Sequence, residues 1–256
     1  MLTIVTTTKD NITDLKATAS SIFSQEDKFF KWLIYDGSKQ NTFSDFEPFL
    51  IRAKKEGVEA SFEHAIDGSV YAAMNSAVNF ATSEYVLFLN CGDMLFNRNS
   101  TLQLNEILNK YEPDVYHTSN VYVDTSYDLH LQKGSHSDEM KHVLHEGIKP
   151  YYPLMVCQQA IVYRTSILRS HPLDPSIRIA ADHNHFLDLL GKDLNFYYGD
   201  IPLSIYFGGG FSWRYGYHCH ADWFYNNLSY SPSPSQELID FFLNSMSDFA
   251  LHHELR

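Results

Sequence analysis

The sequence has few of the features that mark membrane, disulfide-bonded or disordered proteins. None of its 256 residues lies in an apolar run of about 18 or more, the length that a transmembrane helix requires. Only three cysteines occur, Cys91, Cys157 and Cys219, and their wide spacing is not that of a zinc site or a disulfide framework. The 9 prolines and 12 glycines are too few for a collagen-like or low-complexity chain. We therefore expect a folded cytoplasmic protein with reduced thiols.

Basic residues are also scarce. The 19 Lys and Arg stand against 31 Asp and Glu, which gives a formal net charge of −12. Because such a chain repels a phosphate backbone, the composition excludes nucleic acid as a partner. Broad polybasic attachment to anionic lipid is disfavoured for the same reason, and only a local patch from Arg52 to Lys55 is left open.

What the sequence does contain is an alternation of β-rich and helical segments, which is typical of an α/β sheet. Hydrophobic residues make up 44% of the chain, enough for a sizeable core in one large domain or two small ones. The alternation predicts strands at 2–8, 30–35, 58–64 and 85–89. It also predicts helices that follow Asn11, run over 43–55 and follow Ser69.

The carboxyl ends of these strands carry polar residues. Ligands bind outside the carboxyl ends of parallel strands in open α/β sheets. Thr6–Asp10, Asp36–Ser38 and Asn90–Asp93 are therefore expected to converge on one crevice.

The second half of the chain is less regular. Its pattern predicts strands at 114–123 and 159–163, another strand region at 196–207, a helix over Ala181–Leu190 and a loop-rich excursion over 124–146. The Ser-Pro repeat at 231–235 marks a break, and an amphipathic helix is expected after it. We divide the chain into a domain at 1–213, with halves at 1–112 and 113–213, and an aromatic and helical extension at 214–256.

Seven short segments of the sequence are each weak indications of function alone, but their order along the chain is a stronger one. They are Thr6-Thr7-Thr8 after the first strand, Asp36-Gly37-Ser38, Asp67 to Asn75, Phe88-Leu89-Asn90-Cys91-Gly92-Asp93, Cys157-Gln158-Gln159-Ala160, Ile179-Ala180-Ala181-Asp182 and Gly209-Gly210-Phe211-Ser212. In this order they resemble the family 2 glycosyltransferases of the GT-A fold, particularly bacterial members that build capsule, exopolysaccharide or lipopolysaccharide. The resemblance implies a mostly parallel central sheet flanked by helices, with a Rossmann-like nucleotide-binding half and an acceptor-binding half.

The resemblance also implies a reaction. Members of the family move a sugar from a nucleotide-sugar donor to a hydroxyl of a glycan or polyprenyl-linked acceptor, with inversion at the anomeric carbon. A hexosyltransferase of this kind uses Mn²⁺ or Mg²⁺, hard cations that prefer oxygen ligands and neutralise the leaving diphosphate. The implied location is the cytoplasm, with a peripheral encounter at the inner membrane through the C-terminal helix.

Site residues follow from the matching positions. The resemblance implies Asp93, at an exposed strand end, as the metal ligand and Asp182 as the base that takes the acceptor proton. The expected donor-binding residues are Thr6, Thr7, Asp36, Asp67, Asn75 and Asn90, with Thr6 and Thr7 acting largely through their backbone. For Asn75, a helix surface amide is the equal alternative.

Several interpretations stay open at this stage. His218 or His220 is either a late metal ligand or a surface histidine, and the aromatic stretch from Trp213 to Phe224 is either a sugar platform or a homodimer contact. A catalytically weakened GT-A domain that binds without turnover is the second hypothesis, because Asp93 is the only carboxylate in its motif. A Rossmann dehydrogenase is disfavoured, because no G-x-G-x-x-G follows the first strand.

Overall fold

The computed structural model describes residues 1–40, 43–132 and 156–210, together with positions 221, 222, 225, 226, 229, 236, 240 and 244. The predictions for His218, His220 and the aromatic stretch, apart from isolated positions, lie outside the described residues.

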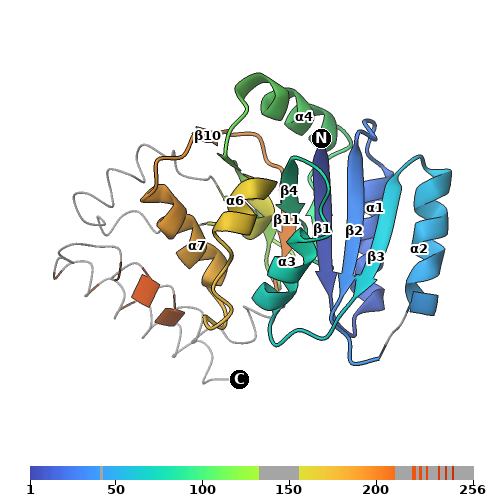
Figure 1. Ribbon diagram of the computed structural model, residues 1–256, viewed down its shortest axis with the longest axis horizontal. Coiled ribbons are helices and arrows are strands. Elements are labelled where there is room, and N and C mark those ends of the chain that lie inside the picture. The colour runs from blue at the N-terminus through green and yellow to red at the C-terminus, as the bar shows by residue number, and fades with distance from the viewer. Residues whose placement is uncertain are drawn as a thin grey trace.

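A seven-stranded sheet forms the centre of the molecule, in the order β10-β6-β9-β4-β1-β2-β3 (Figure 1). Its strands are β1 (Leu2–Thr8), β2 (Phe30–Asp36), β3 (Glu59–His64), β4 (Tyr85–Phe88), β6 (Val115–His117), β9 (Ile161–Arg164) and β10 (Phe196–Tyr198). All neighbouring strands are parallel except β9, which runs antiparallel between β4 and β6. The carboxyl ends of β1, β2 and β3 therefore share one edge of the sheet, at the bottom of Figure 1.

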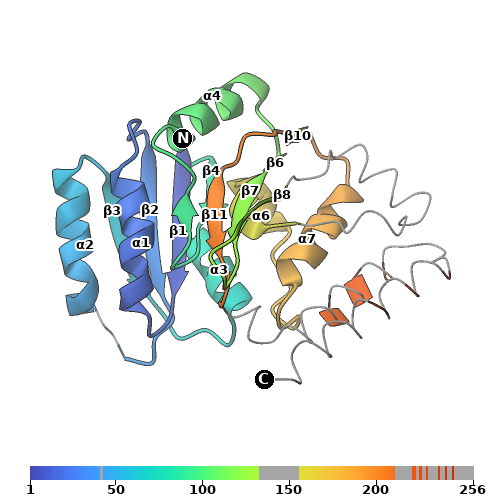
Figure 2. The ribbon, with the colours of Figure 1, turned by 180° about the vertical axis from the view of Figure 1, so that it is seen from behind.

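Helices cover both faces of this sheet. In Figure 1, α3 (Val70–Val78), α6 (Thr165–Ser170) and α7 (Ala181–Leu190) lie in front, and Figure 2 shows α1 (Ile12–Phe23) on the opposite face. Successive strand residues point to opposite faces. Val5 accordingly packs in one buried cluster with α3 and α7, whereas Ile4 packs in the other with α1, α2 (Phe43–Lys55) and α4 (Ser100–Tyr111). The buried sheet with helices on both sides confirms the predicted fold class.

Local signals start and stop the first helices where the sequence predicts. The Asn11 side chain accepts a hydrogen bond from the Asp14 N–H at the start of α1, and Ser69 caps α3 through the Ala72 N–H. After α2 the chain turns at Gly57, whose φ of +76° is in the left-handed region that glycine adopts without strain.

A second sheet has the order β5-β11-β7-β8, and it corrects two predictions. Its strands are β5 (Met94–Leu95), β7 (Asn120–Val123), β8 (Leu129–Gln132) and β11 (Ser204–Phe207). The predicted strands at 114–123 and 196–207 are each wrong as single elements, because each divides between the two sheets. β8 lies in the expected loop-rich excursion, and the short helix η1 (Gln158–Ala160) occupies the start of the strand expected from 159.

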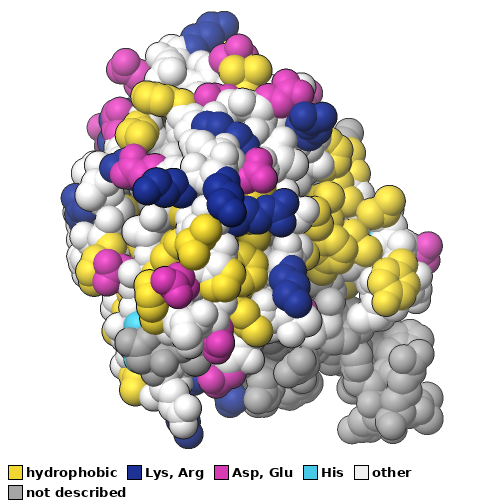
Figure 3. Space-filling model, turned by 90° about the vertical axis from the view of Figure 1, so that its right-hand side faces the viewer, with side chains coloured by type: hydrophobic (Ala, Val, Ile, Leu, Met, Phe, Trp, Pro, Cys, Tyr) yellow, Lys and Arg dark blue, Asp and Glu magenta, His cyan; other side chains and the backbone are white. Residues whose placement is uncertain are grey.

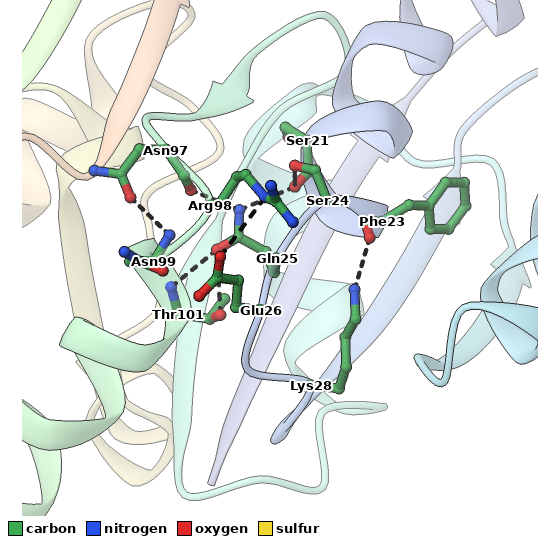
Figure 4. A network of polar contacts seen from close by, with 10 residues as sticks. All are labelled: Ser21, Phe23, Ser24, Gln25, Glu26, Lys28, Asn97, Arg98, Asn99 and Thr101. Atoms are coloured by element: carbon green, nitrogen blue, oxygen red, sulfur yellow. Dashed lines mark hydrogen bonds and ion pairs between the residues drawn. The ribbon is translucent and has the colours of Figure 1, made fainter.

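A polar network closes the amino end of the large sheet (Figure 4). The buried Gln25 side chain donates to the Ser21 and Asn97 carbonyls at 3.0 and 2.8 Å, and its oxygen accepts from the Thr101 N–H at 3.1 Å. Thr101 is in the first turn of α4, so Gln25 satisfies a helix-terminal donor. The network joins the end of α1 to the start of α4, away from the edge where β1 and β2 end.

Basic side chains gather on the face that carries α2 (Figure 3). The last turn of this helix contains Arg52, Lys54 and Lys55. Acidic neighbours lie among them, since Arg52 is 3.7 Å from Glu56 and Lys31 on β2 is 2.7 Å from Glu59 on β3. The local basic patch that the sequence left open is therefore partly neutralised.

Candidate functional site

Hydrogen bonds tie together the carboxyl ends of β1, β2 and β4. The Gly37 N–H donates to the Thr8 carbonyl at 2.9 Å, and the Asp10 N–H donates to Ser38 Oγ at 2.8 Å. On the other side of β1, Thr7 Oγ1 donates to Asn90 Oδ1 at 2.9 Å. The expected convergence of these three strand ends is confirmed.

Two of the expected donor-binding side chains are fully buried. Thr6 Oγ1 accepts the indole N–H of Trp32 at 3.0 Å, and Asp36 Oδ1 accepts from the Ser38 N–H and hydroxyl at 3.1 and 2.5 Å. The side chain of Asp36 thus shapes the turn that presents Ser38. Thr6 is buried as a whole residue, and its contact with a donor through the backbone stays a prediction.

Asp67 precedes α3 and is held by two hydroxyl groups. Tyr35 donates to its Oδ2 and Ser76 to its Oδ1, both at 2.9 Å. Burial, together with the hydrogen bond and charge of Asp67, raises the pKa of the Tyr35 phenol to about 12. Asp67 therefore meets a neutral phenol, and its carboxylate is fixed beside the end of β2.

Asp93 is buried, which corrects the expectation of an exposed strand-end carboxylate. Only 5% of its surface is accessible. Gln159 Nε2 donates to its Oδ2 at 2.6 Å, and the Phe207 N–H donates to its Oδ1 at 3.2 Å. Burial raises the pKa of the carboxyl to about 7, although both hydrogen bonds oppose this change. Asp93 thus links the β4–β5 turn to η1 and β11.

The turn before Asp93 depends on a glycine. Gly92 has a φ of +103°, and its N–H donates to Thr18 Oγ1 on α1 at 2.9 Å. A residue with Cβ would be strained at that φ. The conformation brings Asn90 to Thr7 on one side and Asp93 to Gln159 on the other.

The donor set at this turn is small for a metal ion. Within the described ranges, no three His, Cys, Asp or Glu side chains are grouped so that they could hold one. Each carboxylate oxygen of Asp93 accepts one hydrogen bond, which leaves a lone pair on each. Asp93 therefore fits a site in which one protein carboxylate is completed by oxygens of a bound diphosphate, as Mg²⁺ sites often are.

Asp182 is half-buried in the first turn of α7. Its Oδ1 accepts from the Tyr71 hydroxyl at 3.2 Å and from the His183 N–H at 3.0 Å. Burial raises the pKa of the carboxyl to about 6, with the hydrogen bonds acting in the opposite direction. Such a group is ionised at neutral pH and still basic enough to take a proton.

Cys157 directly precedes the η1 helix that carries Gln159. Burial is the main cause that raises the pKa of its thiol, and the charges of Asp93 and of Asp182 both add to the effect. The charges of both carboxylates thus reach the same thiol. The thiol itself donates to Gln159 Oε1 at 3.1 Å.

Sequence reasoning did not assign a site role to Gln158 or Gln159. Gln159 orients Asp93, and the buried Gln158 amide nitrogen has no hydrogen-bond partner among the residues that the structure describes. The feature that could have indicated a role for them is the place of the Cys-Gln-Gln-Ala segment among the seven segments that resemble the family. Both amide atoms of Asn75 pair with the Leu173 backbone, at 2.8 and 3.0 Å, and its contact with a donor stays a prediction.

Comparison with known proteins identifies the fold. No protein-family model and no curated protein sequence matches this chain. Among solved structures, TarS 1–349 from S. aureus is similar with a TM-score of 0.60 at 14% identity, over 98% of this chain and 73% of that one. The mannosyltransferase PcManGT from Pyrobaculum calidifontis, in complex with GDP-Man and Mn²⁺, has a TM-score of 0.62 at 12% identity, over 98% and 70%.

A third structure, TarS in complex with UDP-GlcNAc, covers 94% of this chain and 71% of its own at 15% identity, with a TM-score of 0.60. These neighbours are glycosyltransferases of GT-A-like fold. At such identities the likeness concerns the fold, and this chain has the mixed α/β fold of GT-A type.

In the described part of the chain, no helix is both long and apolar enough to cross a membrane.

Proposed function

We propose that this protein is an inverting glycosyltransferase that moves a hexose from a nucleotide-sugar donor to a hydroxyl of a glycan or polyprenyl-linked acceptor in surface polysaccharide biosynthesis. The observation that carries the proposal is a pair of carboxylates held in different environments, Asp93 by the Gln159 amide and the Phe207 N–H, and Asp182 by the Tyr71 hydroxyl and the His183 N–H. They lie beside the strand edge where an α/β sheet binds nucleotides.

The donor nucleoside is proposed to bind over the ends of β1 and β2. Backbone groups of Thr6 and Thr7, the turn held by Asp36 and the carboxylate of Asp67 supply polar partners there, and Asn90 lies on the diphosphate side. Two structural neighbours support a nucleotide-sugar ligand, since one is in complex with UDP-GlcNAc and another with GDP-Man and Mn²⁺.

Asp93 is proposed to hold Mn²⁺ or Mg²⁺ together with the donor diphosphate. When bound, the cation offsets the negative charge that develops on the leaving group. Gln159 fixes the carboxylate orientation through the 2.6 Å hydrogen bond. Because one carboxylate offers few ligands, we expect Mn²⁺ to bind weakly alone and more tightly with a nucleoside diphosphate.

Asp182 is proposed to be the general base. Its Oδ1 is anchored by two donors, and Oδ2 is the oxygen that takes the proton from the acceptor hydroxyl. The oxygen of that hydroxyl then attacks the anomeric carbon as the bond to the leaving diphosphate breaks, which inverts the configuration. The position in the first turn of α7 holds the carboxylate on a regular element.

A thermal-shift panel tests the donor assignment. UDP, GDP, dTDP and CMP are added with and without Mn²⁺, and one nucleoside diphosphate should raise the melting temperature. At a ligand concentration of about 100 Kd the gain is roughly 2.7 kcal/mol, or about 5 to 10 °C for a chain of this size. Absence of any shift across the panel would refute the proposal.

The metal and base assignments need separate variants. Asp93→Asn should remove nucleotide-dependent Mn²⁺ binding, measured from the spin resonance of free Mn²⁺. Asp182→Asn should retain it and lower sugar transfer by about 10² to 10⁴-fold. Asp188→Asn is the matched control, because Asp188 follows in the same helix, is 45% exposed and pairs with Lys192. Metal binding that survives in Asp93→Asn would place the cation elsewhere.

A domain that binds a nucleotide sugar without turnover remains the second candidate. The observation that favours it is the single, buried carboxylate at the metal position. Hydrolysis of a bound nucleotide sugar in the presence of Mn²⁺ separates the two, because only the enzyme converts its donor.

A further inference from the structure

The two carboxylate oxygens of Asp182 have unequal surroundings. Oδ1 accepts hydrogen bonds from the Tyr71 hydroxyl and from the His183 N–H. Neither of these two donors reaches Oδ2. The carboxylate is therefore anchored through Oδ1, and a base needs such a fixed orientation.

The anchoring hydroxyl comes from a helix that also holds the approach to α7. Tyr71 and Asn75 are four residues apart on α3, so their side chains project from the same helix face. The Asn75 amide donates to the Leu173 carbonyl and accepts from the Leu173 N–H, and the Tyr71 hydroxyl donates to Asp182, 111 residues later in the chain. α3 thus fixes both ends of the segment from Leu173 to Asp182.

We infer that Tyr71 is a positioning residue for the base: its hydroxyl holds Asp182 Oδ1 so that Oδ2 faces the acceptor hydroxyl. The inference rests on the proposed function for the role of Asp182. Tyr71 itself is 5% exposed and packs in the buried cluster with residues of α7, which leaves its ring little freedom to move the hydroxyl away.

Other titratable groups lie near Asp182 and could contribute to a titration curve of the protein. Burial raises the pKa of the Tyr163 phenol on β9 and of the Cys157 thiol, so both are neutral near pH 7. Asp222 approaches from the C-terminal part and accepts the Ile179 N–H at 3.2 Å. The charge of Asp93 acts on the same Cys157 thiol as that of Asp182, and His183 and Asp188 follow in α7. A signal specific to Asp182 is therefore needed.

Carbon-13 NMR titration of the side-chain carboxyl groups gives that signal without any substrate. The full chain is titrated as wild type, Tyr71→Phe and Tyr85→Phe, and Asp182→Asn assigns the resonance. Loss of one hydrogen bond to a charged acceptor should raise the pKa of Asp182 by about one pH unit in Tyr71→Phe. Tyr85→Phe is the control, because Tyr85 is also buried and its hydroxyl bonds Arg164, away from Asp182.

Transfer kinetics then test the consequence for catalysis. Tyr71→Phe should lower kcat by about 10-fold and leave KM for the donor unchanged, because the hydroxyl acts through Asp182. The acid limb of its pH profile should move to higher pH. In an Asp182→Asn background, Tyr71→Phe should cost nothing further.

The outcomes separate this inference from the proposed function. An unchanged Asp182 pKa in Tyr71→Phe, or an independent loss of kcat in the double variant, overturns the role of Tyr71. Normal transfer by Asp182→Asn overturns the proposed base, and the carboxyl titration still reports whether Tyr71 holds that side chain.

Discussion

Replacing Asp182 by Asn should make the protein more stable at neutral pH while it loses activity. The change keeps the shape of the side chain, and the Oδ1 of Asn can accept the hydrogen bonds from Tyr71 and the His183 N–H. The amide nitrogen takes the place of Oδ2, which neither of these two donors reaches. What the variant removes is a charge that burial disfavours.

The magnitude follows from the pKa. The carboxyl has an ordinary value of 3.8 and a native value of about 6. This difference corresponds to roughly 3 kcal/mol at most, and solvent contact of the half-buried side chain reduces the expected gain to about 1 to 2 kcal/mol. For a chain of this size that is about 2 to 8 °C in melting temperature.

The pH dependence has a definite sign. Below about pH 3.8 both the native and the unfolded Asp182 are protonated, so wild type and variant should differ little. As the pH rises to about 6 and beyond, the native state holds the proton longer than the unfolded state does, and wild type loses stability that the variant keeps. The difference in melting temperature should therefore grow from pH 4 to pH 7 and then level off.

Thermal unfolding at half-unit steps from pH 4 to pH 8 measures this difference. Asp188→Asn serves as the control, since loss of its exposed pair with Lys192 should cost about 0.3 to 0.5 kcal/mol at every pH where the pair is ionised. A lower melting temperature for Asp182→Asn at pH 7, or a difference that does not change with pH, would refute the reasoning.

Two further predictions concern buried amides. Gln158→Met removes a nitrogen that has no partner among the described residues and a 3.4 Å hydrogen bond from Tyr163, and it should cost less than Gln159→Met, which removes the donor of Asp93 and should cost about 1 to 3 kcal/mol in denaturant unfolding; equal effects would contradict the assignment. Gln25→Met should cost a similar amount, because Thr101 and Asn97 lose their partner. Nucleotide affinity by calorimetry should not change in this variant, and a marked loss would mean that the amino end of the sheet is coupled to the site.

The first half of the fold could be predicted because its signals are local. Asn11 and Ser69 each start a helix through their own side chain, and Gly57 ends one through its backbone. The division of 114–123 between two sheets could not be predicted in the same way. β6 pairs with β9 and β10, and β7 pairs with β11, so the break depends on partners that lie far along the chain.

In the candidate site, too, the contacts that depend on distant parts of the chain could not be predicted from the sequence. Asn90 and Ser38 follow parallel strands, and the rule for strand ends correctly brings them to one edge. Gln159 precedes a strand, and it reaches Asp93 because β9 is antiparallel to β4. The burial of Thr6 also depends on a distant partner, the indole of Trp32. Which polar atoms are already used inside the protein cannot be predicted from one segment alone.

The two contacts of α3 also determine where this protein can change in length. Between Leu173 and Asp182 the chain forms a loop whose two ends are held on one helix face, with residues 174–176 and Arg178 exposed. The entropy of closing such a loop grows slowly, by about 0.6 kcal/mol for each doubling of its length. Residues inserted after Asp174 would therefore alter the surface next to the candidate base at a small entropic cost, together with the loss of the exposed hydrogen bonds between Asp174 and Ser176, with Asp182 still held by Tyr71.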